Sequence, residues 1–271
     1  MLKRLAIGTV AALAALGLVV PAAANARTLD EIIKSGVIKV GVQANQPPLS
    51  FIDTRSNWSG FDVDIANLLA EKLGVKAEFV PTDLPARVPN IVSGLIDISL
   101  GALTRTSDRM KVIDFTVPLH TENMAVLTTE KQKDKKSYMD FNDEKYTLVG
   151  CRGCTPAKFT QDNLPKAKLI LVENAAEMVR SVAQGRADAV VANLEFQTEY
   201  MKNYPDVKWV ILPQVIKTAY DAIGVQKGNY TLRDWLNAAL WEIQSAGIHE
   251  QLWEKNFGMK AIVSVVPQYY R

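Results

Sequence analysis

Apolar residues in the first half of the chain follow two alternating patterns, one with the period of a helix and one typical of short buried strands. In residues 62–73 they recur every three or four positions, which places them on one face of a helix. Short apolar runs bounded by glycine and polar residues are typical of buried strands. The pattern predicts strands at 37–42, 77–80 and 96–100, and helices at 62–73 and 87–93. This is a βαβαβ series.

The second half of the chain repeats this order. It predicts strands at 146–150, 168–172 and 187–192, and helices at 156–163 and 175–184. In both halves a helix-ending glycine comes before the third strand, and an aspartate, Asp97 or Asp188, stands near the start of that strand. The alternation predicts an α/β fold with two lobes, each a mostly parallel sheet with helices on both faces.

The end of the chain is expected to return to the first lobe. Its apolar segments predict a strand at 222–225 and helices at 232–246 and 249–257. Two strands would then cross between the lobes, around 119–127 and 217–225. Lobe 1 is predicted to comprise 27–120 and 223–271, and lobe 2 to comprise 121–222. Such sheets bind ligands beyond the carboxyl ends of their strands, so two facing edges predict a cleft.

The first 26 residues have the composition of a secretory signal peptide. Lys3 and Arg4 precede an uncharged apolar run, and small residues lead to a cleavage site near Ala26. The run is too short to span a membrane comfortably. Removal of this segment lowers the Lys and Arg total from 31 to 29, which equals the Asp and Glu total. We expect a net-neutral periplasmic protein, for which nucleic acid is a disfavoured partner.

The segment from Ser93 to Thr116 predicts an anion-binding site. A strand there leads into a helix start rich in Thr, Ser and Asp, with Arg109 in its first turn. The N–H groups of a helix N-terminus, the Thr104 hydroxyl and the Arg109 guanidinium together suit a carboxylate. The alternative interpretation is a capped helix with a surface arginine.

Further motifs follow one another in order along the mature chain. They lie at 40–42, 47–51, 60–64, 93–98, 104–109, 114–115 and 253–258, the last reading Trp-Glu-Lys-Asn-Phe-Gly. In sequence and order they resemble the family 3 extracytoplasmic solute-binding proteins. The resemblance implies a monomeric, two-lobed periplasmic binding protein of type II that closes on a small carboxylate-bearing solute, such as a polar amino acid or a derivative. It also implies a partner, the membrane permease of an ABC transporter, and no cofactor.

The resemblance further suggests which residues contact the ligand. It implies that Arg109 and Thr104 bind an α-carboxylate and that the backbone of Ala102 accepts a hydrogen bond from an α-ammonium. The other candidate contacts are Gln46, Phe51, Arg87, Glu122, Thr155 and Asn193.

Some of these positions depart from the family pattern. Relatives that bind ordinary amino acids carry an aspartate where this chain has Asn193. Either Glu122 or Glu195 would then supply the anion for an ammonium, or the ligand is not a plain α-amino acid. Gln46 and Leu84 stand where many relatives hold the ligand between aromatic rings, which predicts a more polar pocket.

Arg87 stands where relatives that take acidic or small polar ligands also carry arginine. There it would pair with a second carboxylate or a polar group. The alternative is a solvated arginine near a helix start, a position where the helix dipole disfavours a cation.

The two cysteines, Cys151 and Cys154, lie in the loop that in relatives contacts the ligand. In an exported protein a pair this close is expected to form a disulfide, and a redox-active pair is the alternative. Arg152 or Thr155 would then be the ligand contact from this loop.

Other chemistry has weak support in the sequence. His120 and His249 are the only histidines and stand far apart, so no zinc or other metal site is expected. A phosphate-binding glycine loop and a nucleophilic serine motif are both missing, so the chain is not expected to be an enzyme. Two alternatives stay open. One is a cyclohexadienyl dehydratase-like enzyme on the same scaffold with Glu195 or Glu122 as acid or base, and the other is a sensor that binds solute without transport.

Overall fold

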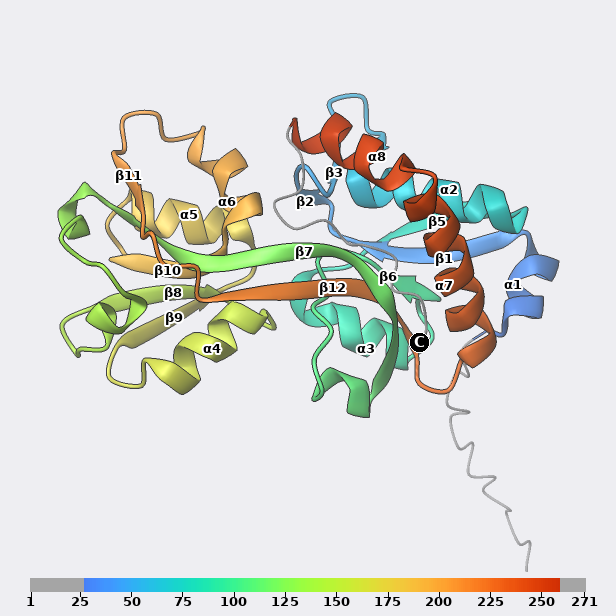
Figure 1. The fold of residues 1–271 in the computed structure, drawn as a ribbon, viewed down its shortest axis with the longest axis horizontal. Coiled ribbons are helices and arrows are strands. Elements are labelled where there is room, and N and C mark those ends of the chain that lie inside the picture. Colours follow the sequence, from blue (N-terminus) through green and yellow to red (C-terminus); the bar gives the residue numbers. More distant parts are fainter. Residues whose placement is uncertain (1–26, 259–271) are drawn as a thin grey trace, which may run out of the picture.

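The computed structural model describes residues 27–258, apart from the side chains of residues 194–196 and 198. Two α/β lobes lie side by side and are joined by two long strands (Figure 1). The predicted signal peptide and residues 259–271, which the sequence assigned to lobe 1, lie outside the described residues.

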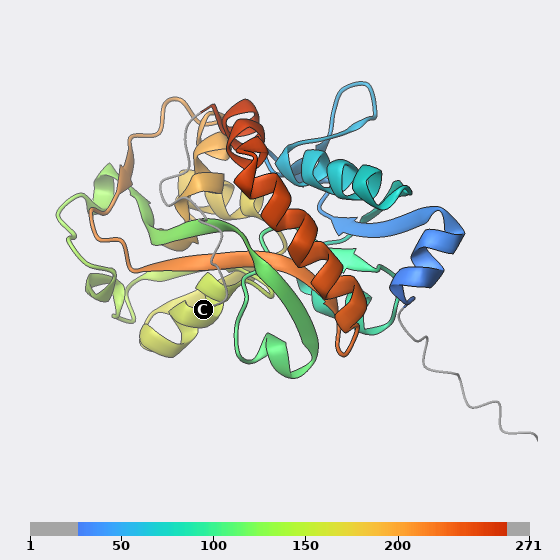
Figure 2. The same cartoon turned by 45° about the vertical axis from the view of Figure 1, so that its right-hand side comes forward.

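Lobe 1 is built on three parallel strands, in which β1 pairs with both of its neighbours. These strands are β1 (Val37–Val42), β5 (Lys76–Pro81) and β6 (Ile98–Ser99). Its helices are α1 (Leu29–Ser35), α2 (Phe61–Leu73), α3 (Arg87–Val92), α7 (Tyr230–Ser245) and α8 (Ile248–Phe257). A small antiparallel sheet is formed by β2 (Asn45–Gln46), β3 (Ser50–Ile52) and β4 (Trp58–Ser59). Figure 2 shows α7 running diagonally across this lobe.

Lobe 2 repeats the plan with a second set of parallel strands. They are β8 (Thr147–Cys151), β9 (Lys168–Val172) and β10 (Ala189–Asn193), with β8 in the middle. Its helices are α4 (Thr155–Asn163), α5 (Ala175–Ala183) and α6 (Leu194–Met201). The short strand β11 (Trp209–Ile211) pairs with a strand that comes from lobe 1.

Two antiparallel strands, β7 (Ile113–Thr129) and β12 (Lys217–Gln226), connect the lobes. They confirm the two predicted crossing strands. They also hydrogen-bond to the sheets on either side, so the two expected sheets form one continuous sheet in the order β5-β1-β6-β12-β7-β10-β8-β9. The register between β7 and β12 shifts at Asp221 and Ala222. Gly224 follows, where a Cβ would lie 2.7 Å from a Leu103 side-chain atom, so this close approach requires glycine.

The two aspartates that the sequence places at matching points act alike. In lobe 1 the Asp97 carboxylate accepts from the Lys39 N–H at 2.6 Å, and in lobe 2 the Asp188 carboxylate accepts from the Thr147 N–H at 2.8 Å. Each aspartate therefore anchors the first strand of its lobe to the third. This confirms the shared plan of the two halves.

Each lobe has its own hydrophobic core. Helix α2 buries Phe61, Ile65 and Leu69 in lobe 1, where α7 and α8 complete the packing. Lobe 2 has two clusters, one on each face of its sheet, centred on buried residues such as Val179 and Leu148. Burial on both faces explains why the strands read as nearly continuous apolar runs.

The predicted helix start near Arg109 is wrong. Residues Arg109–Lys111 form only a single 3₁₀ turn, and β7 begins two residues later. Thr104 forms a β-bridge with Asp221 instead of capping a helix. The apolar alternation that starts at Ile113 favours a strand, which ends the turn after three residues. The helix dipole therefore contributes nothing to an anion site here. The strand predicted at 96–100 is also shorter, since β6 spans Ile98–Ser99.

Candidate ligand-binding cleft

A cavity of about 50 Å³ lies between the lobes, close to the strands that join them. Residues of both lobes and of β7 line it. Leu84 lines it, and so do most residues predicted to contact a ligand: Gln46, Arg87, Ala102, Thr104, Glu122, Thr155 and Asn193. The cavity wall does not include Arg109, which lies behind Thr104, or Phe51, which is half-buried in β3. The side chain of Glu195, the other acidic candidate, lies outside the part of the chain that the structure describes.

Arg109 bridges the two lobes. Its Nη1 donates to the Thr104 carbonyl at 2.7 Å and its Nη2 donates to the Gly153 carbonyl of lobe 2 at 2.8 Å. Burial lowers the pKa of this guanidinium, whereas nearby Asp221 and Glu122 act in the opposite direction. The surface arginine of the alternative interpretation is therefore replaced by a half-buried cation at the edge of the cavity.

Arg87 is not the solvated arginine of the alternative interpretation, because it is only 3% exposed. Its Nη1 donates to the carbonyls of Gly101 and Ala102 at 2.7 and 2.9 Å, and its Nε donates to Leu84 at 2.9 Å. Burial, and then the neighbouring Arg109 cation, lower the pKa of Arg87 to about 9. These contacts hold the loop in which Ala102 has a φ of 52°, a conformation that non-glycine residues rarely adopt.

Two buried carboxyl groups approach the cavity from the joining strands. Glu122, on β7, lines the cavity, and the Asn193 amide donates to its carboxylate. Asp221, on β12, lies beside it and is 1% exposed. Burial raises the pKa of Asp221 to about 6. Hydrogen bonds with the Glu122 and Thr104 side chains favour the charged form and so oppose this rise. One acidic side chain therefore lines the cavity and a second lies beside it, and both interact electrostatically with Arg87 and Arg109.

His120 extends this group away from the cavity. Its Nδ1 lies 3.5 Å from the Asp221 carboxylate, a distance compatible with an ion pair. Burial, however, lowers the pKa of His120 to about 3, so the ring is neutral at physiological pH and no ion pair forms. Asp221 therefore has the arginines as its cationic neighbours.

Asp62, at the start of α2, supports the same loop from behind. It is fully buried and accepts a hydrogen bond from the Gly101 N–H at 2.8 Å. Burial raises its pKa to about 7. Its carboxyl therefore changes charge near neutral pH inside the protein core.

Asp62 and Asp221 predict a pH dependence of stability. In both, the folded-state pKa lies above the model value of 3.8, so the folded protein binds more protons than the unfolded chain between about pH 4 and 7. Their contribution to stability is therefore fully present near pH 4 and is lost as the pH rises toward 7, by on the order of 4 kcal/mol for Asp62. His120 acts in the opposite direction, because its folded-state pKa of about 3 lies below the ordinary value of 6.5. Urea unfolding from pH 4 to 8 isolates the share of Asp62, because the stability of the Asp62→Asn variant relative to the wild type should rise as the pH rises. Parallel curves for both proteins would contradict the assignment.

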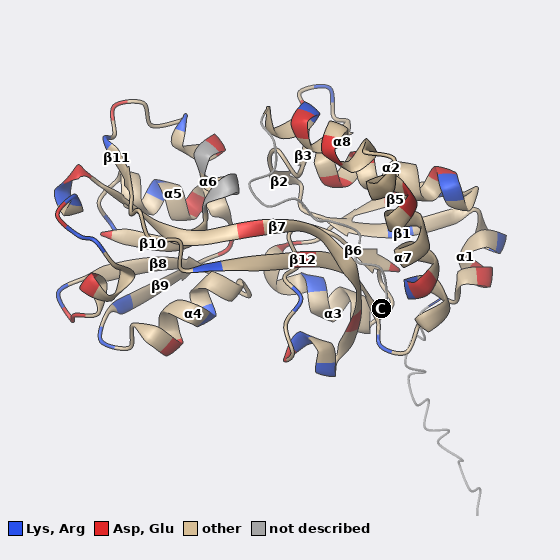
Figure 3. Ribbon diagram, viewed as in Figure 1, with Lys and Arg blue, Asp and Glu red and all other residues tan. Residues whose placement is uncertain are grey.

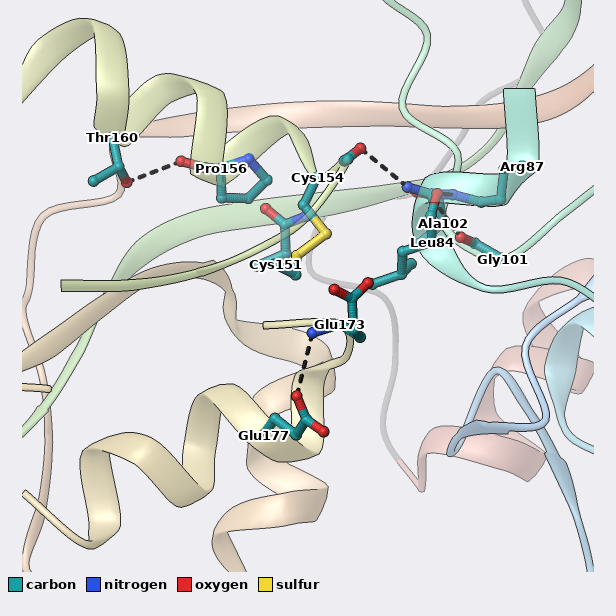
Figure 4. The surroundings of a disulfide bond; sticks show 12 residues. Leu84, Arg87, Gly101, Ala102, Cys151, Cys154, Pro156, Thr160, Glu173 and Glu177 are labelled. Atoms are coloured by element: carbon teal, nitrogen blue, oxygen red, sulfur yellow. Dashed lines mark hydrogen bonds between the residues drawn. A yellow bond between two sulfur atoms is a disulfide. The ribbon is translucent and has the colours of Figure 1, made fainter. Parts of the chain in front are cut away.

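Cys151 and Cys154 form the predicted disulfide, in the loop between β8 and α4 (Figure 4). Both cysteines line the cavity. Arg152 donates through Nε to Glu173 at 2.9 Å, and both side chains are about half exposed. Of the two residues proposed as this loop's ligand contact, only Thr155 faces the cavity.

Several residues of the cleft have no distinctive signal in the sequence. Asp221 and Gln197 are buried polar groups, and Gly153 contributes only its backbone. Tyr200, on α6, donates through its hydroxyl to the Asn45 carbonyl of lobe 1 at 2.8 Å, which is a second contact across the cleft. In the sequence, only the glycine at position 153, between Cys151 and Cys154, indicates that this loop has an unusual conformation.

Figure 3 shows basic and acidic residues interspersed over both lobes. Among the side chains that the structure describes within residues 27–258, three or more His, Cys, Asp or Glu do not gather anywhere in a way that would hold a metal ion. Within the same range, every helix is too short or too polar to cross a membrane.

Two α/β lobes joined by two strands, with a cavity lined from both lobes, define a two-lobed solute-binding protein. The chain belongs to the bacterial extracellular solute-binding proteins, family 3, whose model matches residues 38–259. Among curated relatives, it is 27% identical over 225 residues to the ABC transporter arginine-binding protein 1 of Escherichia coli (81% of this chain, 90% of the relative). It is also 28% identical over 187 residues to the cyclohexadienyl dehydratase of Pseudomonas aeruginosa (68% and 70%).

A solved structure supports the same assignment. The chain is similar to the crystal structure of an ancestral amino-acid-binding protein, described as a precursor of cyclohexadienyl dehydratase. The TM-score is 0.78 and the sequence identity is 35%, over 84% of this chain and 99% of that one. The fold is therefore that of the two-lobed binding proteins.

Proposed function

We propose that the protein is the periplasmic receptor of an ABC uptake transporter and that it closes on a small zwitterionic solute, a polar amino acid or a derivative. The observation that carries the proposal is the pairing of opposite charges around one cavity. We assign a carboxylate to Arg109, at the edge of the cavity, and to the Thr104 hydroxyl, which hydrogen-bonds to Asp221 in this structure. Glu122 offers an acceptor for an ammonium. Family membership and the arginine-binding relative support it.

In this proposal, Glu122 takes the place of the aspartate that the family pattern has at the position of Asn193. The Asn193 amide donates to the Glu122 carboxylate. A carboxylate is therefore still present in this part of the cavity, on the residue next to Asn193 in space. At the two positions where many relatives carry aromatic residues, Gln46 forms a polar part and Leu84 an aliphatic part of the cavity wall. We therefore propose that the ligand carries an α-ammonium group.

The size of the cavity favours a small ligand. Its volume of about 50 Å³ is a few times the roughly 10–15 Å³ that one water molecule needs by the same kind of measure. The closed cleft suits a single amino acid better than a peptide. A cleaved leader at 1–26 would deliver the receptor to the periplasm, where its partner would be the membrane permease.

A panel experiment tests this proposal. Mass spectrometry of solute that copurifies with the protein is followed by thermal shifts with amino acids, opines and dicarboxylates. A solute at 100 times its dissociation constant should stabilise the protein by about 2.7 kcal/mol. We expect at least one amino acid to do so. If every α-amino acid leaves the melting temperature unchanged, the proposal is wrong.

A dehydratase is the second candidate, because Glu122 and Asp221 place an acid beside a carboxylate-binding group and one relative is a cyclohexadienyl dehydratase. We propose binding and not catalysis, since the charges of the cavity already complement a zwitterion. Turnover of prephenate or arogenate by the purified protein would reverse this choice. Uptake assays with the partner permease would separate transport from sensing.

A further inference from the structure

The loop between β8 and α4 reaches across the cleft through its backbone. The Gly153 carbonyl accepts from Arg109 Nη2 at 2.8 Å and faces Arg87 Nη2 at 3.5 Å. Both arginines belong to lobe 1 and Gly153 belongs to lobe 2. These hydrogen bonds therefore exist only when the lobes are closed, and one acceptor serves two buried or half-buried cations.

Glycine is required at this position for two reasons. Its φ is +76°, in the left-handed region that favours glycine, and a Cβ would lie 3.0 Å from Pro85 Cα. Pro85 is in lobe 1, so the backbones of the two lobes touch here. A side chain at position 153 would therefore press against Pro85 and disfavour this contact between the lobes.

The disulfide encloses this glycine. Cys151 ends β8 and Cys154 is the residue before α4, so the bond fixes both ends of a two-residue span. Within it the Cys154 N–H donates to the Cys151 carbonyl at 3.2 Å, and the Arg152 N–H donates to Val172 at 2.8 Å. Few rotations remain by which the Gly153 carbonyl could turn away from lobe 1.

We propose that Gly153 is the latch with which lobe 2 holds lobe 1 in the closed receptor, and that the Cys151–Cys154 disulfide positions its carbonyl for Arg109 and Arg87. The proposal rests on the proposed function only in that a solute binds in this cleft. The latch stabilises the closed arrangement of the lobes with or without solute, so it acts mainly on the rate of opening and on solute release.

The disulfide also makes the latch sensitive to thiols. A dithiol such as dithiothreitol attacks one sulfur of the pair as a thiolate, and the other cysteine leaves as a thiolate that takes up a proton. The second thiol of the reagent then displaces the first cysteine, so the protein gains two electrons and two protons while the reagent becomes a cyclic disulfide. Gly153 keeps its place in the chain but loses the constraint on its carbonyl.

Three forms of the protein test the latch against a matched control. They are Gly153→Ala, the double variant Cys151→Ser with Cys154→Ser, and the dithiothreitol-reduced wild type. Gly185→Ala is the control, because Gly185 lies in the same lobe, has a φ of +70° and would meet nothing closer than Lys131 Nζ at 3.8 Å. It carries the same backbone strain away from the cleft.

Small-angle X-ray scattering supplies a readout that needs no ligand. We expect a larger radius of gyration for the three test forms than for the wild type and Gly185→Ala, with melting temperatures of the two glycine variants close to each other. Equal radii for all forms would overturn the proposal. The cysteine variants and the reduced protein keep the test decisive if Gly153→Ala folds poorly.

Stopped-flow kinetics with L-arginine as the probe supply a second readout. Dissociation should become about tenfold faster in the test forms, with association changed less than about twofold, since a hydrogen bond to a charged group is lost only in the closed state. Unchanged dissociation would contradict the latch. If L-arginine fails to bind the wild type, that result excludes this probe only, and the scattering comparison alone decides on the latch.

Discussion

Arg109→Ala is expected to weaken binding of amino-acid solutes by at least about 100-fold while the protein stays folded. Each hydrogen bond between a guanidinium and a carboxylate in a closed cleft contributes about 1.5–3 kcal/mol, and a guanidinium can form two of them in parallel. Its own partners are backbone carbonyls, so the fold does not depend on an ion pair with it. Isothermal titration calorimetry with the solute found in the panel measures the loss.

Two controls separate the carboxylate contact from general damage. Arg105→Ala removes an exposed arginine from the same segment and should leave the affinity unchanged. The decarboxylated amine of the solute should bind wild type and Arg109→Ala about equally, because it lacks the group that Arg109 recognises. If the variant discriminates between acid and amine as well as the wild type does, Arg109 does not bind the carboxylate.

The strand and helix order could be predicted because both lobes bury their sheets between helices. Apolar runs and terminating glycines then mark the elements directly, and Asp97 and Asp188 mark the matching joints. The strands β7 and β12 were also foreseen. Their full length was not, because a strand that passes from one core to another has no single periodicity.

The pairing of Glu122 with Asp221 beside the cavity could not be predicted from the local sequence pattern. Asp221 lies 99 residues after Glu122 and meets it only because β12 pairs with β7. Arg87 illustrates the same limit. Its position near a helix start suggested either a ligand contact or a solvated side chain, whereas its donors reach backbone carbonyls that only the folded loop brings near it.

For the Cys151–Cys154 pair, the bond could be predicted from the sequence but its structural role could not. Two close cysteines in an exported chain predict a disulfide on chemical grounds alone. The orientation of the Gly153 carbonyl toward Arg109 depends on how the lobes meet, and the chain encodes that in β7 and β12, far from the loop.

Glu122→Gln is expected to weaken binding of solutes that carry an α-ammonium by about 10- to 100-fold. The amide is nearly isosteric, so the change removes charge from the cavity and little volume, and a charge-assisted hydrogen bond is lost. The matching α-hydroxy acid, which has no ammonium, should bind wild type and variant with similar affinity. Calorimetry with the two solutes measures the difference, and equal losses for both would show that Glu122 only supports the fold.

A second substitution tests whether the carboxylate can be moved to the neighbouring strand. In the wild type, Asn193→Asp should bring no gain, because a carboxylate beside Glu122 and Asp221 would stay protonated. In the Glu122→Gln background the same change places one carboxylate where an amide already meets residue 122, and it should restore part of the affinity. A gain in the wild type would mean that Asn193, and not Glu122, faces the ammonium. Failure of the rescue with an intact fold would mean that only the position of Glu122 on β7 aligns the charge with the solute.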